Sequence, residues 1–486
     1  MIISMLNHKI ILRIFGLLLV TEGVFMWLSM LIGVIFGENI LMPFLISGMI
    51  TCAAGLAGFL PTRKSSLEVS RRDGYVIVTG GWVLFSLFGT LPFLLTGSIP
   101  GFTDAFFETI SGFTTTGASI LNDIESLSHG VLFWRSLTQW LGGMGIILLS
   151  LIILPFLGIG GMQLYAAEVP GPTPDKLHPH VQDTARRLWM IYVLFTLTET
   201  LLLWAGKMNL FDAINHSFTT MATGGYSTKQ ASIAHWNSPY IHYVITCFML
   251  LAGTNFILSF YALNGRFRKV WNNEEFRWYL GFLGGFTLLI TFGLLISSGG
   301  GIEPAFRNAA FQVVSILTTT GFVTADYLSW VPWLGILILI LMFFGGSAGS
   351  TGGGPKIMRI VILLKNSTQE LKRLIHPNAV IPVRLNRNAV EESVIINVLA
   401  FLALYAVIAL VSIALLSMLG HDLETSIGAV AATLGNIGPG IGGVGPVENY
   451  AGIHPAGKWF LSFLMLVGRL ELFTVMVLFS RVFWRR

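Results

Sequence analysis

The stretch Phe113-Thr114-Thr115-Thr116-Gly117-Ala118-Ser119 recurs in weaker form three times along the 486-residue chain. The later copies are Met221-Ala222-Thr223-Gly224-Gly225-Tyr226-Ser227, Leu317-Thr318-Thr319-Thr320-Gly321-Phe322-Val323 and Ala432-Thr433-Leu434-Gly435-Asn436-Ile437-Gly438. This comparison makes Gly117, Gly224, Gly321 and Gly435 equivalent. Each copy follows a short apolar run and lies between two longer ones. Because self-similarity indicates a repeated structural unit, the sequence predicts four units of long helix, short helix, Thr/Gly segment and long helix.

The chemistry of the Thr/Gly segments favours a filter for cations. A short helix that stops inside a membrane leaves its last carbonyl groups unpaired, at the negative end of its dipole. Glycine then allows the chain to turn further carbonyl groups towards a common axis. One such segment is equally compatible with a threonine-rich loop, but four can form rings of oxygen that replace the hydration shell of K⁺. The backbone carbonyl groups expected to bind K⁺ are those of Thr115, Thr116, Gly117, Ala222, Thr223, Gly224, Thr319, Thr320, Gly321, Leu434, Gly435 and Asn436.

The composition is that of a membrane protein. Hydrophobic residues make up 54% of the chain and charged residues only 11%, against roughly 25% charged residues in soluble domains. The net charge is +5, and the basic residues lie in short loops between apolar runs, which follows the positive-inside rule and argues against a nucleic-acid partner. Both cysteines, Cys52 and Cys247, fall within apolar runs, so no disulfide framework is implied.

The apolar runs predict an all-α integral membrane protein with ten spanning helices and four half-helices. Residues 1–73 form a two-helix extension, with helices near 11–36 and 40–61 that are each long enough to cross about 30 Å of hydrocarbon. Pore repeats around a central pore follow at 74–160, 187–265, 275–365 and 391–486, with short helices near 103–113, 211–221 (from Asp212), 304–317 (from Pro304) and 423–433. The second spans of the first and fourth repeats are expected near 131–158 and 456–484.

Basic loops indicate the orientation in the membrane. Positive charges gather at Arg63 to Arg72, at Lys176 to Arg187, around Arg387 and in the tail from Arg481 to Arg485 and Arg486. The positive-inside rule therefore places both termini in the cytoplasm and the mouths of the filter outside. All four repeats share one orientation, which argues against the alternative of a transporter built from inverted repeats.

A glycine-rich stretch interrupts the second long run of the third repeat. Its six glycines are Gly345, Gly346, Gly349, Gly352, Gly353 and Gly354, and each costs about 1 kcal/mol relative to alanine in a helix. A nucleotide-binding loop is excluded because Pro355 follows the last glycine and Ile357 replaces the required Ser/Thr. Irregular backbone at membrane depth needs protein or a water-filled cavity beside it. We therefore expect a gate below the filter, with a static packing kink as the alternative.

Arg469 lies in the last apolar run, about 20 Å along the helix from Ala456. This places it near the bilayer core, where an arginine is energetically expensive and usually functional. We expect it in the pore below the filter, as an electrostatic barrier to cations. The alternative is a buried ion pair with a carboxylate such as Glu199 or Glu471, although Glu471 is only two residues away and faces another side of the helix.

Four motifs resemble the membrane subunit of the Trk/Ktr/HKT superfamily of potassium transporters, most closely its bacterial TrkH branch. They are the Thr/Gly segments, Gln139-Trp-Leu-Gly-Gly-Met-Gly145, Gly345 to Gly354 and Gly468-Arg-Leu-Glu471. From the residues alone, the three glycines of 139–145 predict close helix packing. The resemblance covers essentially the whole chain, and its weakest point is the fourth segment, with Leu434 and Asn436 in place of threonines.

The resemblance implies K⁺ uptake across the bacterial inner membrane and no enzymatic activity. It also supports Gly345 to Gly354 as a gate and Arg469 as a pore residue. Expected partners are a second copy in a homodimer, membrane lipid, and a separate cytosolic TrkA-type ring that binds nucleotides and sets gate opening. A Na⁺- or H⁺-coupled potassium symporter and a non-conducting membrane scaffold stay open as alternatives.

Overall fold

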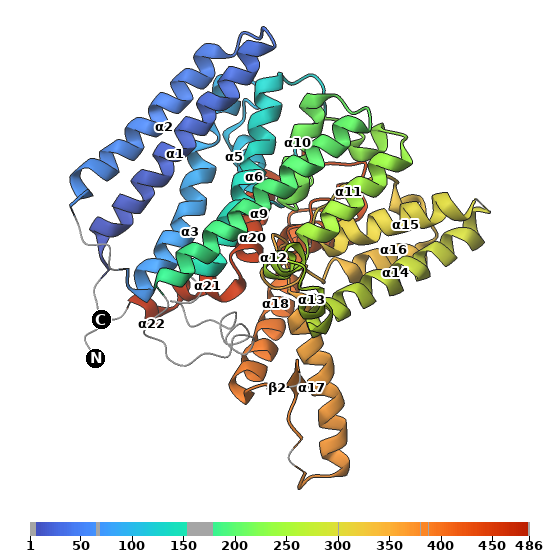
Figure 1. Ribbon diagram of the computed structural model, residues 1–486. Helices are drawn as coiled ribbons and strands as arrows, with labels where there is room; N and C mark the ends of the chain where they lie inside the picture. Colours follow the sequence, from blue (N-terminus) through green and yellow to red (C-terminus); the bar gives the residue numbers. More distant parts are fainter. Residues whose placement is uncertain are drawn as a thin grey trace.

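The computed structural model describes residues 6–64, 69–152, 178–299, 301–379, 381–386 and 388–484, which are almost entirely helical (Figure 1). Several predicted features lie outside the described residues. They are the basic residues Lys176, Arg387, Arg485 and Arg486 and the end of the span expected at 131–158. Among the described residues, six helices are long and apolar enough to cross a membrane, and counting each of two bent helix pairs as one span gives eight. The chain is therefore a multi-pass membrane protein.

The two N-terminal helices, α1 (His8–Ile35) and α2 (Leu41–Thr62), confirm the extension expected at 11–36 and 40–61. They pack closely because small residues meet at their interface. A Cβ atom added to Gly16 would lie 2.5 Å from the Gly55 carbonyl oxygen, and one added to Gly55 would lie 2.7 Å from the Gly16 carbonyl oxygen. Small residues of this kind let helix backbones approach each other within a membrane.

Four repeats of the expected helix order follow the extension. The first contains α3 (Arg71–Phe88), α4 (Leu91–Leu95), α5 (Phe102–Phe113) and α6 (His129–Ile152), and the second α9 (His178–Ala205), α10 (Leu210–Met221), α11 (Pro239–Ala252) and α12 (Phe256–Leu263). The third contains α14 (Glu274–Ser298), α15 (Ile302–Leu317), α16 (Pro332–Leu341) and α17 (Ile357–Ile375), and the fourth α18 (Glu392–Met418), α19 (Leu423–Leu434), α20 (Pro455–Arg469) and α21 (Leu472–Met476). Shorter elements are α13 (Phe267–Asn272), α22 (Arg481–Trp484), η2 (Ser232–His235), η3 (Tyr327–Ser329), η4 (Gly442–Val444) and η5 (Val477–Phe479).

The short helices α5, α10, α15 and α19 are called the pore helices below. Two of them, α10 and α15, begin slightly before their predicted first residues. Helix α10 begins at Leu210 and not at Asp212, because the Asn209 side chain caps it by accepting a hydrogen bond from the Asp212 amide over 2.7 Å. Helix α15 begins at Ile302, two residues before Pro304. Asparagine is among the preferred residues at such a cap, so the missed signal was Asn209.

The second spans of the second and fourth repeats are sharply bent, and the apolar runs in the sequence do not indicate these bends. Helices α11 and α12 meet at 109°, and the pair from α20 to residue 479 is bent by 118°. The continuous span expected at 456–484 is therefore wrong. At the second bend Glu471 has a positive φ of 61°, which a continuing right-handed helix does not allow. Long apolar runs fix the presence of a span, but they carry little information about a break inside it.

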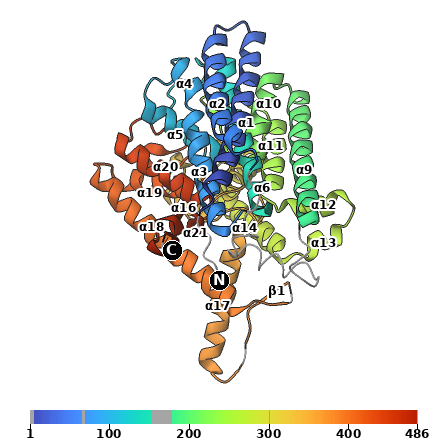
Figure 2. The same ribbon diagram turned by 90° about the vertical axis from the view of Figure 1, so that its left-hand side faces the viewer.

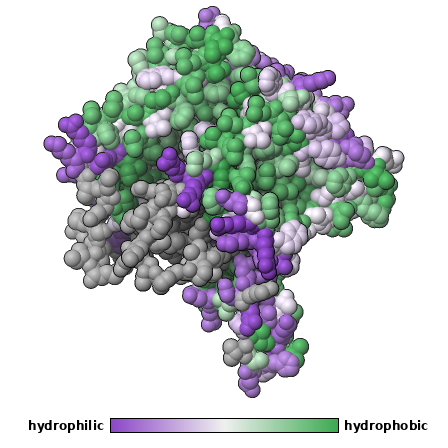
Figure 3. Space-filling model, in the orientation of Figure 1, coloured by the Kyte–Doolittle hydropathy of each residue, from purple (hydrophilic) through white to green (hydrophobic). Residues whose placement is uncertain are grey.

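The third repeat has a different interruption, because residues 342–356, here called the glycine loop, connect α16 to α17. Helix α17 then projects from the body of the molecule (Figures 1 and 2). A short hairpin follows it, made of two strands of two residues each, β1 (Arg384–Leu385) and β2 (Asn388–Ala389). The start of α1 and helix α22 lie towards the same end. Apolar residues cover most of the visible body, and hydrophilic residues gather where α17 leaves it (Figure 3).

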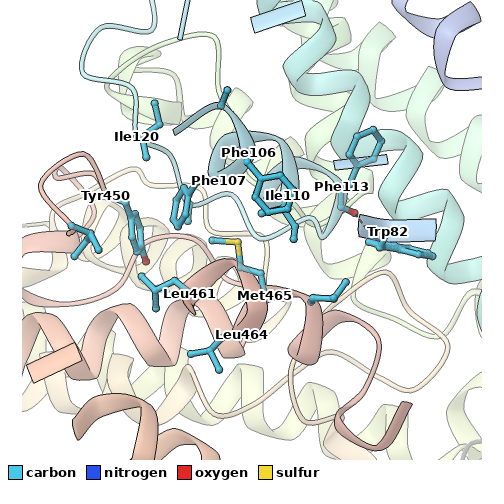
Figure 4. Close-up of a cluster of buried hydrophobic side chains, with 14 of the residues drawn as sticks. Trp82, Phe106, Phe107, Ile110, Phe113, Ile120, Tyr450, Leu461, Leu464 and Met465 are labelled. Carbon is cyan, nitrogen blue, oxygen red and sulfur yellow. Dashed lines mark hydrogen bonds between the residues drawn. The ribbon is translucent and has the colours of Figure 1, made fainter. Parts of the chain in front are cut away.

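A buried apolar cluster joins the first repeat to the fourth. Phe107 and Ile110 of α5 lie against Leu461 and Met465 of α20 (Figure 4). Tyr450 lies at the edge of this cluster, and its hydroxyl donates to the Gly438 carbonyl over 2.8 Å. The cluster therefore packs the first repeat against the fourth, and through Tyr450 it supports the fourth Thr/Gly segment.

Candidate ion-conducting site

The four pore helices end in the same hydrogen-bonded pattern, a Schellman motif. In the first repeat the Thr116 amide donates to the Ser111 carbonyl over 2.9 Å, and the Thr115 amide donates to the Gly112 carbonyl over the same distance. The motif places one residue in the left-handed conformation, usually glycine. Here that residue always carries a side chain: it is Thr115 (φ 52°), Thr223 (φ 53°), Thr319 (φ 61°) or Asn436 (φ 54°). Strained backbone of this kind clusters at functional sites.

A glycine with positive φ follows two positions after each of these residues. The four glycines are Gly117 (φ 81°), Gly225 (φ 76°), Gly321 (φ 81°) and Gly438 (φ 98°). The equivalence expected from the sequence is therefore right for Gly117 and Gly321 and wrong for Gly224 and Gly435. Gly224 lies one position earlier in its segment. Gly435 lies three positions earlier, as the residue that caps α19 after Leu434.

The four segments close into a ring through these glycines. A Cβ atom added to Gly117 would lie 2.1 Å from the carbonyl oxygen of Gly224 in the second segment. The other three contacts are Gly225 to the Thr320 oxygen at 2.0 Å, Gly321 to the Ile437 oxygen at 1.8 Å, and Gly438 to the Thr116 oxygen at 2.8 Å. Real Cβ atoms essentially never come within 3.0 Å of such an atom. Each segment thus packs on the next, and the fourth packs on the first.

Side chains brace this ring from behind. Gln139 of α6 donates from Nε2 to the Gly224 carbonyl over 2.7 Å, and its Oε1 accepts from the Tyr226 amide over 3.1 Å. Asn436 donates from Nδ2 to the Thr116 hydroxyl over 2.8 Å, so it links the fourth segment to the first. The packing expected for 139–145 fits Gly142, where an added Cβ would lie 2.0 Å from the Phe113 oxygen. The role of Gln139 was missed, although a lone amide in an apolar run was visible in the sequence.

A buried ion pair inside the first repeat, whose arginine also contacts the second repeat, was missed as well. Arg135 of α6 contacts Glu108 of α5 at 2.6 Å, and their side chains are 3% and 0% exposed. Arg135 also donates to the Ser227 carbonyl over 2.9 Å and lies 3.6 Å over the ring of Tyr226. The Tyr226 hydroxyl in turn donates to the Glu108 backbone carbonyl over 2.7 Å. Breaking a buried pair of this kind is strongly destabilising, so it holds the second segment on the first pore helix.

The glycine loop lies against the ends of three pore helices. The Gly353 amide donates to the Thr319 hydroxyl over 2.7 Å, and the Thr351 hydroxyl lies 3.0 Å from the Met221 carbonyl oxygen. A Cβ atom added to Gly353 would lie 2.5 Å from Cβ of Asn436. Only glycine can bring the backbone this close. The loop therefore runs beneath the second, third and fourth segments.

The other predicted glycines of the loop also make close contacts. Gly345 donates to the Pro355 carbonyl over 2.7 Å and closes the base of the loop. The nearest atoms outside the loop belong to Gly253 for Gly346, to Asn255 for Gly349, to Thr318 for Gly352 and to Gly435 for Gly354. All six predicted glycines therefore belong to one connected structure.

Arg469 reaches this loop from the end of α20. Its guanidinium donates to the Thr351 carbonyl over 2.5 Å and to the Gly142 carbonyl over 3.0 Å, and the residue is 2% exposed. None of the described carboxylates forms an ion pair with it, and Glu471 instead pairs with Arg359 at 2.7 Å. Arg469 thus connects the loop to α6 through hydrogen bonds. Its positive charge is not neutralised by an ion pair with any described residue.

Lys356 is a second cation at this site that the sequence did not point to. It stands at the end of the loop, just before α17, and its ammonium group donates to the Gly352 carbonyl. The loop is therefore held by two basic side chains, each bound to a loop carbonyl. Chemically, the ring beside it carries backbone carbonyl groups at the negative ends of four helices, a setting that favours a cation.

Comparison with known proteins identifies the family of this chain. A family model described as TrkH, cation transport protein, matches residues 40–300 and 301–485. The chain is 43% identical to the Trk system potassium uptake protein TrkH of Escherichia coli K12, over 99% of this chain and 100% of the relative, and 34% identical to TrkG of the same organism, over 98% and 99%. The crystal structure of the potassium transporter TrkH from Vibrio parahaemolyticus matches with a TM-score of 0.91 and 37% identity, over 99% of this chain and 100% of that one. These relatives are named as transporters and not as enzymes, and the chain belongs to the TrkH family of cation transport proteins.

Proposed function

We propose that this protein takes up K⁺ across the bacterial inner membrane through the ring of four Thr/Gly segments. The observation that carries the proposal is the closed ring itself, with the carboxyl end of a pore helix behind every segment. Four such helix ends supply negative potential, and carbonyl oxygen is the ligand that replaces water around K⁺. The relatives named as potassium uptake proteins support the choice of ion.

The corrected register refines which carbonyl groups bind the ion. Equivalent positions in the ring are Thr116, Gly224, Thr320 and Ile437, each followed by the positive-φ glycine. We assign the K⁺ sites to the carbonyl groups of residues 115–117, 223–225, 319–321 and 436–438. Ala222 and Leu434 then belong to the ends of the pore helices, where they contribute through the helix dipole.

Uptake of ⁸⁶Rb⁺ into liposomes that contain the purified protein tests the proposal. We expect uptake that K⁺ outside the vesicle blocks by competition and that Na⁺ blocks far less. Liposomes without protein provide the background. Uptake at the background level would identify a non-conducting membrane scaffold instead.

The glycine loop is the gate in this proposal, and Arg469 is its electrostatic barrier. Support comes from the position of the loop below three segments and from the hydrogen bonds that join it to Arg469 and Lys356. A loop of this composition can rearrange because its glycines impose little conformational restriction. Opening would require the Arg469 contact with Thr351 to break.

Replacing Thr351 with valine should loosen this gate. The hydroxyl lies 3.0 Å from the Met221 carbonyl oxygen and 3.2 Å from the Ala252 carbonyl oxygen, and one hydrogen bond contributes about 1 kcal/mol. Basal ⁸⁶Rb⁺ uptake should therefore rise about fivefold. The matched control is Thr291→Val in α14, whose hydroxyl bonds only to Thr287 within its own helix. Unchanged uptake by a Thr351→Val protein of lower melting temperature would mean that the loop is a fixed packing element.

Regulation and assembly follow the family pattern in this proposal. The protein forms a homodimer in contact with membrane lipid, with both termini in the cytoplasm, and a cytosolic TrkA-type ring that binds nucleotides sets the opening of the gate. Support comes from the basic loops and from relatives named as members of a Trk system. Helix α17 starts where the glycine loop ends, so a cytosolic partner that moved α17 would act directly on the gate.

Proton coupling is a second candidate, and the buried carboxyl group of Glu199 favours it. Glu199 of α9 is fully buried beside the Thr220 side chain, and it forms no ion pair with any described residue. An ionisable side chain inside a membrane span is by default a functional candidate. In a proton-coupled symporter, Glu199→Gln should abolish the response of uptake to an imposed pH gradient and leave downhill uptake intact. A parental uptake rate that does not change with an imposed pH or Na⁺ gradient would identify a channel.

A further inference from the structure

Two neighbouring hollows lie beside α14 and α17, away from the ring. The first has a volume of about 480 Å³ and lies between α14, α17 and the chain before β1, and the second, of about 470 Å³, continues along α14. Trp278 lines both. The two hollows are therefore neighbours on either side of Trp278, and together they are here called the α14–α17 groove.

The groove is basic at the end nearest the hairpin. Lys365, Lys372 and Arg384 line the first hollow, and Arg277 lines the second. Glu274 is the one carboxylate that lines either hollow, and it is already paired with Lys365. Lys372 and Arg384 form no ion pair with any described residue. This end of the groove therefore carries an excess of positive charge.

The groove becomes apolar along α14, which is one of the six apolar helices long enough to span a membrane. Trp278 and Leu364 are 36% and 44% exposed. On the same face of α14, Cβ atoms added to Gly281, Gly284 or Gly285 would meet nothing within 4 Å. No described part of the chain covers this glycine face. Tryptophan favours the boundary between membrane and water, which puts the basic end at the level of lipid head groups.

We propose that the α14–α17 groove binds an anionic phospholipid, with its phosphate among Lys372, Arg384 and Lys365 and an acyl chain along the glycine face of α14. The chemistry of the two ends selects this ligand. Basic pockets beside transmembrane helices bind anionic head groups. A soluble phosphate or a neutral lipid would each use only one half of the groove. The site lies outside the ion pathway, so the proposal does not depend on how ions cross the membrane.

Titration of the delipidated full-length protein with phosphatidylglycerol or phosphatidylcholine, followed by native mass spectrometry, tests the proposal. The parent protein should bind phosphatidylglycerol more tightly. The double variant Lys372→Ala, Arg384→Ala should lose about 25-fold in that affinity, about fivefold for each basic residue near the head groups. Its affinity for phosphatidylcholine should stay at the parental level. The control variant Arg266→Ala, Arg268→Ala removes the same charge from exposed positions around α13.

A second variant tests the apolar half without a change of charge. Gly281→Leu fills part of the second hollow, and it should fold normally because an added Cβ meets open space. It should weaken phosphatidylglycerol binding while inorganic phosphate fails to compete. Equal parental affinity for the two lipids, an equal loss in the Arg266/Arg268 control, or unchanged binding by Gly281→Leu would each overturn the proposal. Efficient displacement of the lipid by inorganic phosphate would also overturn it, as a site for free phosphate only.

Discussion

Gly321→Ser should lower the K⁺/Na⁺ permeability ratio about a hundredfold, which corresponds to about 2.7 kcal/mol of lost discrimination. An added Cβ would lie 1.8 Å from the Ile437 carbonyl oxygen, and Gly321 has φ of 81°. A side chain is strained in this conformation wherever it stands. In addition, the third and fourth segments must move apart by more than 1 Å to reach the 3.0 Å limit of real Cβ contacts. A wider ring no longer matches K⁺ and admits Na⁺.

The matched control is Gly265→Ser, between α12 and α13. Gly265 has φ of 71°, but an added Cβ there meets nothing within 4 Å. This variant therefore suffers the same backbone strain without the clash, and it should keep parental selectivity with only a lower melting temperature. Bi-ionic measurements of K⁺ and Na⁺ flux in liposomes compare the two proteins. Equal selectivity of Gly321→Ser and the parent would refute the filter.

Arg469→Ala should raise ⁸⁶Rb⁺ uptake about tenfold. A unit charge about 5 Å from a passing cation raises its energy by about 3 kcal/mol at an effective dielectric constant of about 20. Water in the pathway weakens that repulsion, so the rate should gain about tenfold and not the full hundredfold. The substitution also removes the hydrogen bonds that hold Thr351 and Gly142, which acts in the same direction. Arg469→Lys keeps the charge and should stay near the parental rate.

Arg307→Ala provides the comparison for Arg469. Arg307 is another mostly buried arginine, but it lies on α15 and pairs with Glu303 at 3.2 Å. Its removal should leave uptake unchanged. Uptake and melting temperature should be measured on the same preparations. Slower uptake together with a large fall in melting temperature for Arg469→Ala would show that this arginine serves only to hold the fold.

The architecture could be predicted because the spans, the pore helices and the repeats each produce their own pattern in the sequence. Long apolar runs mark the spans, short ones mark the pore helices, and the Thr/Gly segments show that the unit repeats. Helices α5 and α19 lie within one residue of their predicted limits. Gly345 to Gly354 could not form a helix, and the structure has a loop there.

The register of the second and fourth segments could not be predicted, because matching residue types is a poor guide to backbone conformation. Met221 to Ser227 contains two adjacent glycines, and the choice of Gly224 ignored which of them needs a positive φ. In the fourth repeat α19 extends to Leu434, so a segment assigned there began inside the helix. A threonine in the left-handed conformation is unusual enough that no propensity scale would have suggested Thr223.

Polar contacts between residues far apart in the chain could also not be predicted from the sequence. Gln139 and Gly224 are 85 residues apart, and nothing local distinguishes this glutamine from a polar residue in a helix interface. Arg135 and Glu108 could be recognised singly as costly within apolar runs, but their pairing depends on how α5 and α6 cross. The bend after Arg469 depends on the same tertiary context.

All four segments of the ring belong to one polypeptide. In an ion pathway assembled from four identical chains, one substitution changes every side at once. Here the carbonyl groups at the glycine contacts come from Thr116, Gly224, Thr320 and Ile437, so the sides already differ and each can vary alone. Under the proposed function, a single substitution can therefore change one side of the ring and its effect on selectivity while the other three sides stay intact.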